Sequence, residues 1–385
     1  MSDNVMARER ETVGSYEEIA EAAVRSTGLT DFGDGRHEEG LRVLVDDLNS
    51  PAAGLTPRGR YFQRSEVKSA LVGRLLTQAQ FAAHPERHQV RIERPVFVMG
   101  MPRTGTTILH RLLHADPAAQ GLEMWLTQFP QPRPPRETWE ADPIFTAMQR
   151  SFAAHHEASP DYAGIHYLDA TTVEECWRLL RQTGKSNSYE SLAYLPQYTE
   201  WLRRQDWTDA YARHRENLQL IGINDVEKRW VLKNPSHMSA LDAVMSVYPD
   251  ALIVYTHREP VTCIASACSL TAETTAGQSE TFVGERLGRS QLELWSHAYH
   301  AFHDARSAYD QSQFVEIGFG DLVRDQVGTA RAVYDAFGLD WNSDVEAAIA
   351  AVDREAREGK AAPNHAYSLS DYGLTERQVL DAFDR

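Results

Sequence analysis

Four short apolar runs stand out along the chain, and each is followed by a stretch with helical periodicity. The runs are 95–99 (PVFVM), 230–233 (WVLK), 251–256 (ALIVYT) and 313–317 (QFVEI). Continuous apolar runs that alternate with helical sequence are typical of buried parallel strands joined by helical crossovers. The pattern therefore predicts an α/β fold in which a parallel sheet of about four to five strands is flanked by helices.

Two long segments of the chain show helical periodicity without a strand pattern. In residues 15–90, apolar side chains recur at intervals of three and four, as at Leu41, Leu44, Val45 and Leu48. We expect residues 1–90 to form a helical N-terminal segment that packs on a main domain covering 91–385. A mostly helical insertion of about 118–228 follows the first strand and begins with the proline-rich stretch 128–139. Near the C-terminus, one helix is expected from 321 to Gly338, a residue that often ends helices.

The composition narrows the class of protein. The hydrophobic fraction of 42% is sufficient for a real core, and the net charge of −16 argues against a general nucleic-acid or acidic-membrane binder. The N-terminus is acidic and polar, unlike a signal peptide, and no apolar run reaches the roughly 20 residues of a membrane span. The three cysteines, Cys176, Cys263 and Cys268, lack metal-ligand spacing and are interpreted as reduced core residues. We expect a cytoplasmic protein whose oligomeric state is open, with a homodimer as one option.

The stretch RPVFVMGMPRTGTTILHRLL, residues 94–113, indicates an anion-binding loop. A hydrophobic strand runs into Gly100, and Gly105 precedes two threonines that open a helix. The free backbone amides at a helix N-terminus bind anions, and Arg103 adds a positive charge from within the loop. A nucleotide triphosphatase would carry lysine where Thr106 stands. Without that lysine, we expect a group of lower charge, such as a sulfuryl group, and no metal ion.

A second element, ALIVYTHREPVTCIASACSL at 251–270, follows the third predicted strand. Arg258 comes at the end of this strand, and Pro260 fits the first turn of the next helix. Ser266 lies about two helical turns beyond Arg258, so that both could hold a second phosphate. Because the carboxyl ends of parallel strands share one sheet edge, the two elements are expected to lie together.

These two stretches resemble the 5′-phosphosulfate loop and the 3′-phosphate motif of sulfotransferases, which use 3′-phosphoadenosine 5′-phosphosulfate (PAPS). The arginine in PRTGTT resembles the branch that contains tyrosylprotein sulfotransferases and many bacterial enzymes. The resemblance extends over roughly 94–340 and implies the P-loop-like sulfotransferase fold. It assigns donor binding to the following residues: Pro102, Arg103, Thr104, Gly105, Thr106, Thr107, Arg258 and Ser266. The C-terminal R-K-G segment of the cytosolic branch has no clear match here.

Transfer to a hydroxyl needs a base for the acceptor proton and positive charge for the oxygens of the transferred group. Glu123 in GLEMW matches the position of the glutamate base in the arginine-loop branch, with a structural glutamate as the alternative. Lys233 in VLKNPSH resembles the lysine that stabilises the leaving phosphate and the sulfuryl oxygens. Together with Arg103 these residues are the candidate catalytic groups.

Other residues near the predicted sheet edge provide alternatives. His237 and His166 are alternative bases, because the cytosolic branch uses histidine. Glu174 and Glu175 are interpreted instead as acidic residues of a helix N-terminus, where the helix dipole favours negative charge.

The sequence therefore favours an enzyme that moves a sulfuryl group from PAPS to a small-molecule hydroxyl, without a metal. A small-molecule kinase and a non-catalytic nucleotide-binding protein are the competing functions. Aromatic residues of the insertion fit a hydrophobic or aromatic acceptor, although they fit core packing equally well. They are Trp125, Phe129, Trp177, Tyr194, Tyr198 and Trp201.

Overall fold

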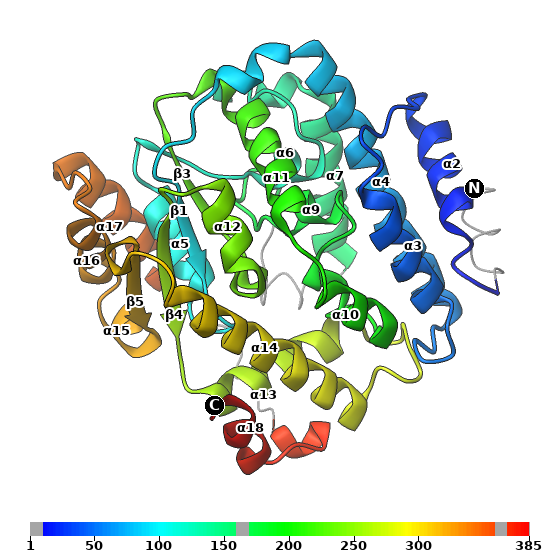
Figure 1. Cartoon of the computed structure of the whole chain (residues 1–385). Helices are drawn as coiled ribbons and strands as arrows, with labels where there is room; N and C mark the ends of the chain where they lie inside the picture. Colours follow the sequence, from blue (N-terminus) through cyan, green and yellow to red (C-terminus); the bar gives the residue numbers. More distant parts are fainter. Residues whose placement is uncertain (1–10, 159–168, 359–367, 385) are drawn as a thin grey trace.

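In the computed structural model, which describes residues 11–158, 169–358 and 368–384, one parallel sheet forms the centre of the molecule (Figure 1). Its strands are β1 (Val96–Met99), β2 (Ala119–Gln120), β3 (Arg229–Lys233), β4 (Leu252–His257) and β5 (Phe314–Gly318). The order across the sheet is β2-β3-β1-β4-β5, and all neighbouring pairs are parallel. The predicted α/β fold is confirmed. The four predicted strands are each found within one residue, and the two-residue strand β2 was missed.

Helices cover both faces of this sheet. They are α2 (Tyr16–Thr27), α3 (His37–Leu48), α4 (Pro57–Ala83), α5 (Thr106–His114), α6 (Met124–Gln128), α7 (Pro143–Ala158), α9 (Trp177–Arg181), α10 (Pro196–Leu202), α11 (Thr208–Ile221), α12 (Leu241–Val247), α13 (Pro260–Thr274), α14 (Gly284–Arg306), α15 (Phe319–Arg324), α16 (Gln326–Phe337), α17 (Ser343–Glu358) and α18 (Glu376–Phe383). In Figure 1, α5, α16 and α17 lie on one side of the sheet, and α11, α12 and α14 lie on the other.

Alternate residues of β1 enter two separate cores, as the two-residue period of a strand requires. Val96 and Val98 belong to a core shared with α5, α16 and α17. Phe97 and Met99 belong to a larger core that also contains the N-terminal helices and the insertion. Since all four side chains are buried, β1 is covered on both faces, which explains its uninterrupted hydrophobic sequence.

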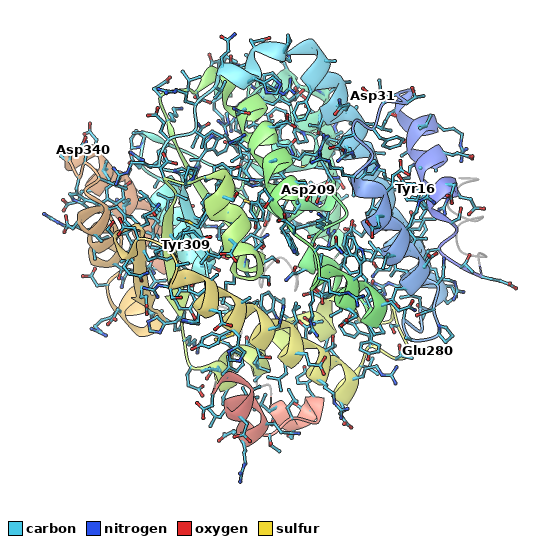
Figure 2. The ribbon with its side chains drawn as sticks, viewed as in Figure 1. Tyr16, Asp31, Asp209, Glu280, Tyr309 and Asp340 are labelled. Carbon is cyan, nitrogen blue, oxygen red and sulfur yellow. The ribbon has the colours of Figure 1, made fainter. Side chains whose placement is uncertain are left out.

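The N-terminal helices α2 to α4 pack against the insertion. In α4, Gln63 donates to the carbonyl oxygen of Leu192 across 3.0 Å, and Arg74 donates to that of Gln182 across 3.1 Å. Figure 2 shows Tyr16 and Asp31, from this N-terminal part, on the opposite side of the molecule from Asp340, which follows α16. The domain boundary near residue 90 stays a prediction.

The single helix predicted from 321 to 338 is wrong, because the chain forms α15 and α16 with a break at Asp325. The side chain of Asp325 accepts a hydrogen bond from the amide of Gly328 and so begins a new helix. The predicted helix end is confirmed: Gly338 has φ +59°, a left-handed conformation that glycine adopts without a steric cost.

Candidate functional site

The loop between β1 and α5 has the tight geometry that its two glycines indicated. Gly105 adopts φ +91°, and a Cβ atom there would lie only 2.6 Å from Cδ2 of Leu322. Arg103 has φ +74°, a conformation that costs a non-glycine residue about 1–3 kcal/mol and is found mainly at functional sites. The loop therefore holds an exposed arginine in a strained backbone conformation directly before the N-terminus of α5.

Thr104 stabilises the loop from inside. Its hydroxyl donates to the carbonyl oxygen of Met101 across 2.7 Å and lies 2.6 Å from the hydroxyl of Thr256 in β4. Thr104 is fully buried, so its side chain holds the loop together rather than facing solvent. Pro102 and Thr107 are half-buried, and Thr106 is the buried first residue of α5.

The structure brings the second predicted element against the loop. Arg103 donates from Nε to Oγ of Ser266 in α13, across 3.0 Å. Nη1 of Arg258 lies 3.4 Å from the carbonyl oxygen of Arg103. Both predicted phosphate-binding elements therefore lie at the carboxyl edge of the sheet.

Phe319, the first residue of α15, was missed by the sequence analysis. Cζ of Arg258 lies 4.2 Å from the centre of the Phe319 ring, so the ring supports the guanidinium by a cation–π contact. The available signal was its place directly after the last strand of the sheet, at the same edge as Arg103.

Lys233 ends β3 beside β1 and faces the same edge. Its Nζ atom donates to the hydroxyl of Thr107 across 3.2 Å and forms an ion pair with Glu175. The lysine side chain is 4% exposed. The predicted position of Lys233 beside the loop is confirmed by the Thr107 contact, whereas its catalytic role stays a prediction.

Glu174 and Glu175 are interpreted from the sequence as acidic residues that stabilise a helix dipole, but Glu175 instead forms an ion pair with a residue of the sheet. Its carboxylate contacts the ammonium group of Lys233 in the sheet, two residues before α9 begins. Burial raises the pKa of Glu175, and Lys233 opposes part of that rise. Glu174, in contrast, accepts a hydrogen bond at its carboxylate from the amide of Glu175 across 2.8 Å.

Glu123 is buried in an ion-pair network at the β2 edge. Its carboxylate lies 3.1 Å from Nε of Arg133, and Arg133 also bonds Asp225 and Gln120, both at 2.8 Å. Burial raises the pKa of Glu123, and the arginine offsets part of this increase. Arg133 comes from the proline-rich stretch, so the network joins that loop to the sheet.

Of the two histidines proposed as alternative bases, His237 lies in the described part of the chain, and its side-chain hydrogen bond is to α11 rather than to the loop. His237 is fully buried, and its Nδ1 lies 2.6 Å from the hydroxyl of Tyr211. Burial, together with the neighbouring His214 and Lys233, lowers the pKa of His237 far below its ordinary value. His166 lies outside the described residues.

The aromatic residues of the insertion separate into two groups. Trp125, Tyr198 and Trp201 are buried in the core. Phe129 is half-buried and lines a groove of about 450 Å³ with residues of α7: Pro143, Ile144, Ala147, Met148 and Ser151. Trp177 and Tyr194 are half-buried and lie against arginine side chains.

Within residues 11–158, 169–358 and 368–384, no cluster of three or more histidine, cysteine, aspartate or glutamate side chains could hold a metal ion. No helix in these ranges has the length and hydrophobicity to cross a bilayer. The three cysteines are buried and are not disulfide-bonded.

Comparison with solved structures gives close matches over nearly the whole chain. Sulfotransferase STF1 from Mycobacterium tuberculosis matches with a TM-score of 0.91 and 48% identity, covering 97% of this chain and 99% of that protein. Sulfotransferase STF9 from Mycobacterium avium matches with a TM-score of 0.87 and 27% identity, covering 98% of this chain and 96% of its own.

Sequence comparisons point to the same family. Omega-hydroxy-beta-dihydromenaquinone-9 sulfotransferase Stf3 of Mycobacterium bovis is 25% identical over 259 residues, which is 64% of this chain. The match spans 63% of that relative, less than two thirds of its length. The model of the sulfotransferase family matches residues 95–343, well over half of the chain. The chain therefore belongs to the sulfotransferase family.

Proposed function

We propose that this protein transfers a sulfuryl group from PAPS to the hydroxyl group of a hydrophobic acceptor. The observation that carries the proposal is the hydrogen bond of 3.0 Å between Arg103 and Ser266. It joins the loop after β1 to the helix after β4, so that two anion-binding elements form one continuous surface. A nucleotide with phosphates at both the 5′ and 3′ positions matches such a surface.

The two halves of this surface have different tasks in the proposal. The amides at the start of α5, Thr107 and Arg103 bind the 5′-phosphosulfate, because helix N-terminal amides and an arginine favour an anion. Arg258 and Ser266 bind the 3′-phosphate through charge-assisted hydrogen bonds. Phe319 holds the Arg258 guanidinium in place through their contact of 4.2 Å.

Glu175 is the proposed base. Its carboxylate and the Thr107 hydroxyl both contact the ammonium group of Lys233, which places it beside the donor loop. Its side chain is 24% exposed, and a carboxylate whose pKa is raised by partial burial is a stronger proton acceptor than a fully solvated one. Glu123 remains the alternative; its carboxylate pairs with Arg133 in the network at the β2 edge, whereas that of Glu175 pairs with the lysine that contacts the loop.

The proposed step conserves atoms and charge. The acceptor oxygen attacks sulfur, and the bond from sulfur to the bridging phosphate oxygen breaks. Glu175 takes the acceptor proton, and Lys233 stabilises the negative charge that grows on the bridging oxygen. The products are a sulfate ester and adenosine 3′,5′-bisphosphate, and the proton then leaves Glu175 for water.

The proposed acceptor is a small hydrophobic or aromatic alcohol. The groove lined by Phe129 and α7 supports this class, because its walls are mainly apolar. The matched Mycobacterium bovis relative is described as acting on a hydroxylated menaquinone derivative, which is also hydrophobic. A strongly anionic acceptor is disfavoured by the net charge of −16.

A screen of acceptors tests this function directly. The purified protein is incubated with PAPS and separate pools of hydrophobic alcohols, phenols and hydroquinones, and products are identified by mass spectrometry. We expect a mass gain of one sulfuryl group that requires both donor and protein. Phosphorylated products formed with ATP and Mg²⁺ would favour a kinase. Donor binding without turnover across all pools would favour a non-catalytic protein.

A further inference from the structure

The N-terminal helix α4 makes polar contacts with α9, the helix that begins two residues after Glu175. Glu66 of α4 forms an ion pair with Arg181 of α9. A second connection runs through the side chain of Gln128 in α6. Its Nε2 atom donates a hydrogen bond to the hydroxyl of Ser69, and its Oε1 atom accepts one from Arg178. Both arginines of α9 are thus joined to one face of α4.

Both of these arginines also contact the ring of Trp177. The Cζ atoms of Arg178 and Arg181 lie 4.2 Å and 4.1 Å from its ring centre, within the range of cation–π contacts. The preceding residue, Cys176, donates its amide hydrogen to the carbonyl oxygen of Lys233 across 3.1 Å. Glu175 therefore belongs to a short segment that is held by β3 on one side and, through the arginines, by α4 on the other.

The contact between Glu66 and Arg181 is largely withdrawn from water. The side chain of Arg181 is 6% exposed and that of Glu66 is 23% exposed. Breaking such a pair leaves a buried charge without compensation, which costs far more than losing an exposed pair. Arg178 is influenced by the carboxylates of both Glu174 and Glu66, whereas the ion pair of Arg181 within the described residues is with Glu66.

We propose that Glu66 and Ser69 are positioning residues for sulfuryl transfer, which hold α9 so that the carboxylate of Glu175 stays against Lys233. The inference rests on the proposed function, since it takes Glu175 as the base. The two residues lie outside the segment 95–343 that matches the family. The N-terminal helices of this chain are thereby part of the machinery that aligns its active site.

The size of the expected effect follows from the precision that proton transfer requires. A base must lie within about 2.6–3.2 Å of the proton donor's heavy atom, and a misplacement of about 1 Å can cost roughly 10²-fold in rate. We expect Glu66→Gln to lower kcat about ten- to 100-fold. Its affinity for adenosine 3′,5′-bisphosphate should stay near that of the wild type, because Arg103, Arg258 and Ser266 lie on other elements.

Glu39→Gln is a matched control. Glu39 of α3 also joins the N-terminal helices to the insertion, because it accepts a hydrogen bond of 2.9 Å from Nε1 of Trp201 in α10. This hydrogen bond reaches α10 and not α9. We expect this variant to keep the wild-type kcat, so an equal loss in both variants would overturn the positioning role in favour of general destabilisation.

Two further readouts separate positioning from mere stability. In Glu66→Gln, the amide of Cys176 should exchange its hydrogen faster, while the exchange in β1 stays unchanged. The acidic limb of the kcat pH profile should move to higher pH. When Glu175 moves away from Lys233, it loses the ammonium group that lowers its pKa, while burial and Glu174 continue to raise that pKa. Restoring the charge with Glu66→Asp should recover part of the rate. Unchanged exchange and an unchanged profile would overturn the proposal.

The same measurements distinguish this inference from the proposed function. If Glu66→Gln does not fold, Ser69→Ala removes the second connection with a smaller structural change and should show the same pattern more weakly. If both variants transfer the sulfuryl group at the wild-type rate, the positioning role is rejected and the proposed function stands. A wild-type protein that binds the bisphosphate and transfers nothing would reject the proposed function, and the positioning role with it.

Discussion

Arg103 in the loop after β1 and Ser266 in α13 are hydrogen-bonded across 3.0 Å, although 163 positions separate them in the chain. The contact exists because β1 and β4 are parallel neighbours whose carboxyl ends meet at one edge. It links an arginine in a strained conformation to a buried hydroxyl. A single nucleotide that carries phosphates at both its 5′ and 3′ positions can therefore contact both residues.

Arg258→Ala should weaken the binding of adenosine 3′,5′-bisphosphate far more than that of adenosine 5′-phosphate. A charge-assisted contact contributes about 1.5–3 kcal/mol, so the expected loss is roughly ten- to 150-fold. Calorimetric titration of both nucleotides measures this difference. Arg324→Ala is the control, since this arginine of α15 is 75% exposed. Equal losses for the two nucleotides would remove Arg258 from the 3′-phosphate site.

Glu175→Gln should bind the donor normally and lose about 10²–10⁴ in turnover, the usual range for a positioned base. The deficit should shrink with acidic phenols, which release their proton more easily. Because a base must be ionised, wild-type kcat should rise with pH through the raised pKa of Glu175, and this limb should vanish in the variant. Kinetics across acceptors of graded acidity measure both effects.

Glu123→Gln provides the contrasting variant. Its turnover should stay near normal, whereas its free energy of unfolding should fall by about 1–3 kcal/mol, because Arg133 loses one buried partner and keeps Asp225. Chemical denaturation measures the loss. A large rate deficit in Glu123→Gln, with normal rates in Glu175→Gln, would return the role of base to Glu123.

Lys233→Ala should lose about 10²–10³ in rate with every acceptor, whatever its acidity, because the lysine acts on the leaving group. Lys228→Ala is the matched control. Lys228 precedes the same strand at its amino end, away from the loop, where it pairs with Asp225 across 2.9 Å. A deficit in Lys233→Ala that depends on the acidity of the acceptor would contradict its assignment to the leaving group.

Glu190 should make the protein less stable as the pH rises. Burial raises its pKa to about 7 from an ordinary value of 4.5, so the folded protein retains a proton that the unfolded chain releases. Between these two values, unfolding releases the proton, and the free energy of unfolding falls with increasing pH by about 3 kcal/mol in total.

Unfolding at pH 5 and pH 8 measures this dependence. Glu190→Gln should lose much less stability over that interval than the wild type. Glu200→Gln changes an exposed glutamate of α10 and should behave like the wild type. If Glu190→Gln and the wild type show the same dependence on pH, the proton is not held by Glu190.

The fold and the tight loop after β1 could be predicted because their signals are local. A buried strand needs a continuous apolar run, and the tight turn after it needs glycines, which the sequence shows directly after the first run. The two residues of β2 are too few to show such a run. The break at Asp325 also had a local signal, since aspartate often precedes a helix as its N-cap, but the helical pattern around it was continuous.

The contacts of the candidate base could not be predicted in the same way. Glu175 and Lys233 are 58 positions apart, and their ion pair depends on how the insertion folds over the sheet edge. Acidic residues before a helix are common for other reasons, so the sequence alone favoured the dipole interpretation. Glu123 stood nearer to the loop in sequence, yet Arg133 from the proline-rich stretch engages its carboxylate.

The most direct test of the account follows donor and acceptor in one reaction. PAPS and an acceptor from the screen are mixed with excess protein in a strong chelator, and adenosine 3′,5′-bisphosphate and sulfated acceptor are quantified over a single turnover. The account predicts that both products form in equal amounts and at the same rate, without a divalent ion. Bisphosphate released without sulfated acceptor, or activity that only added Mg²⁺ restores, would contradict it.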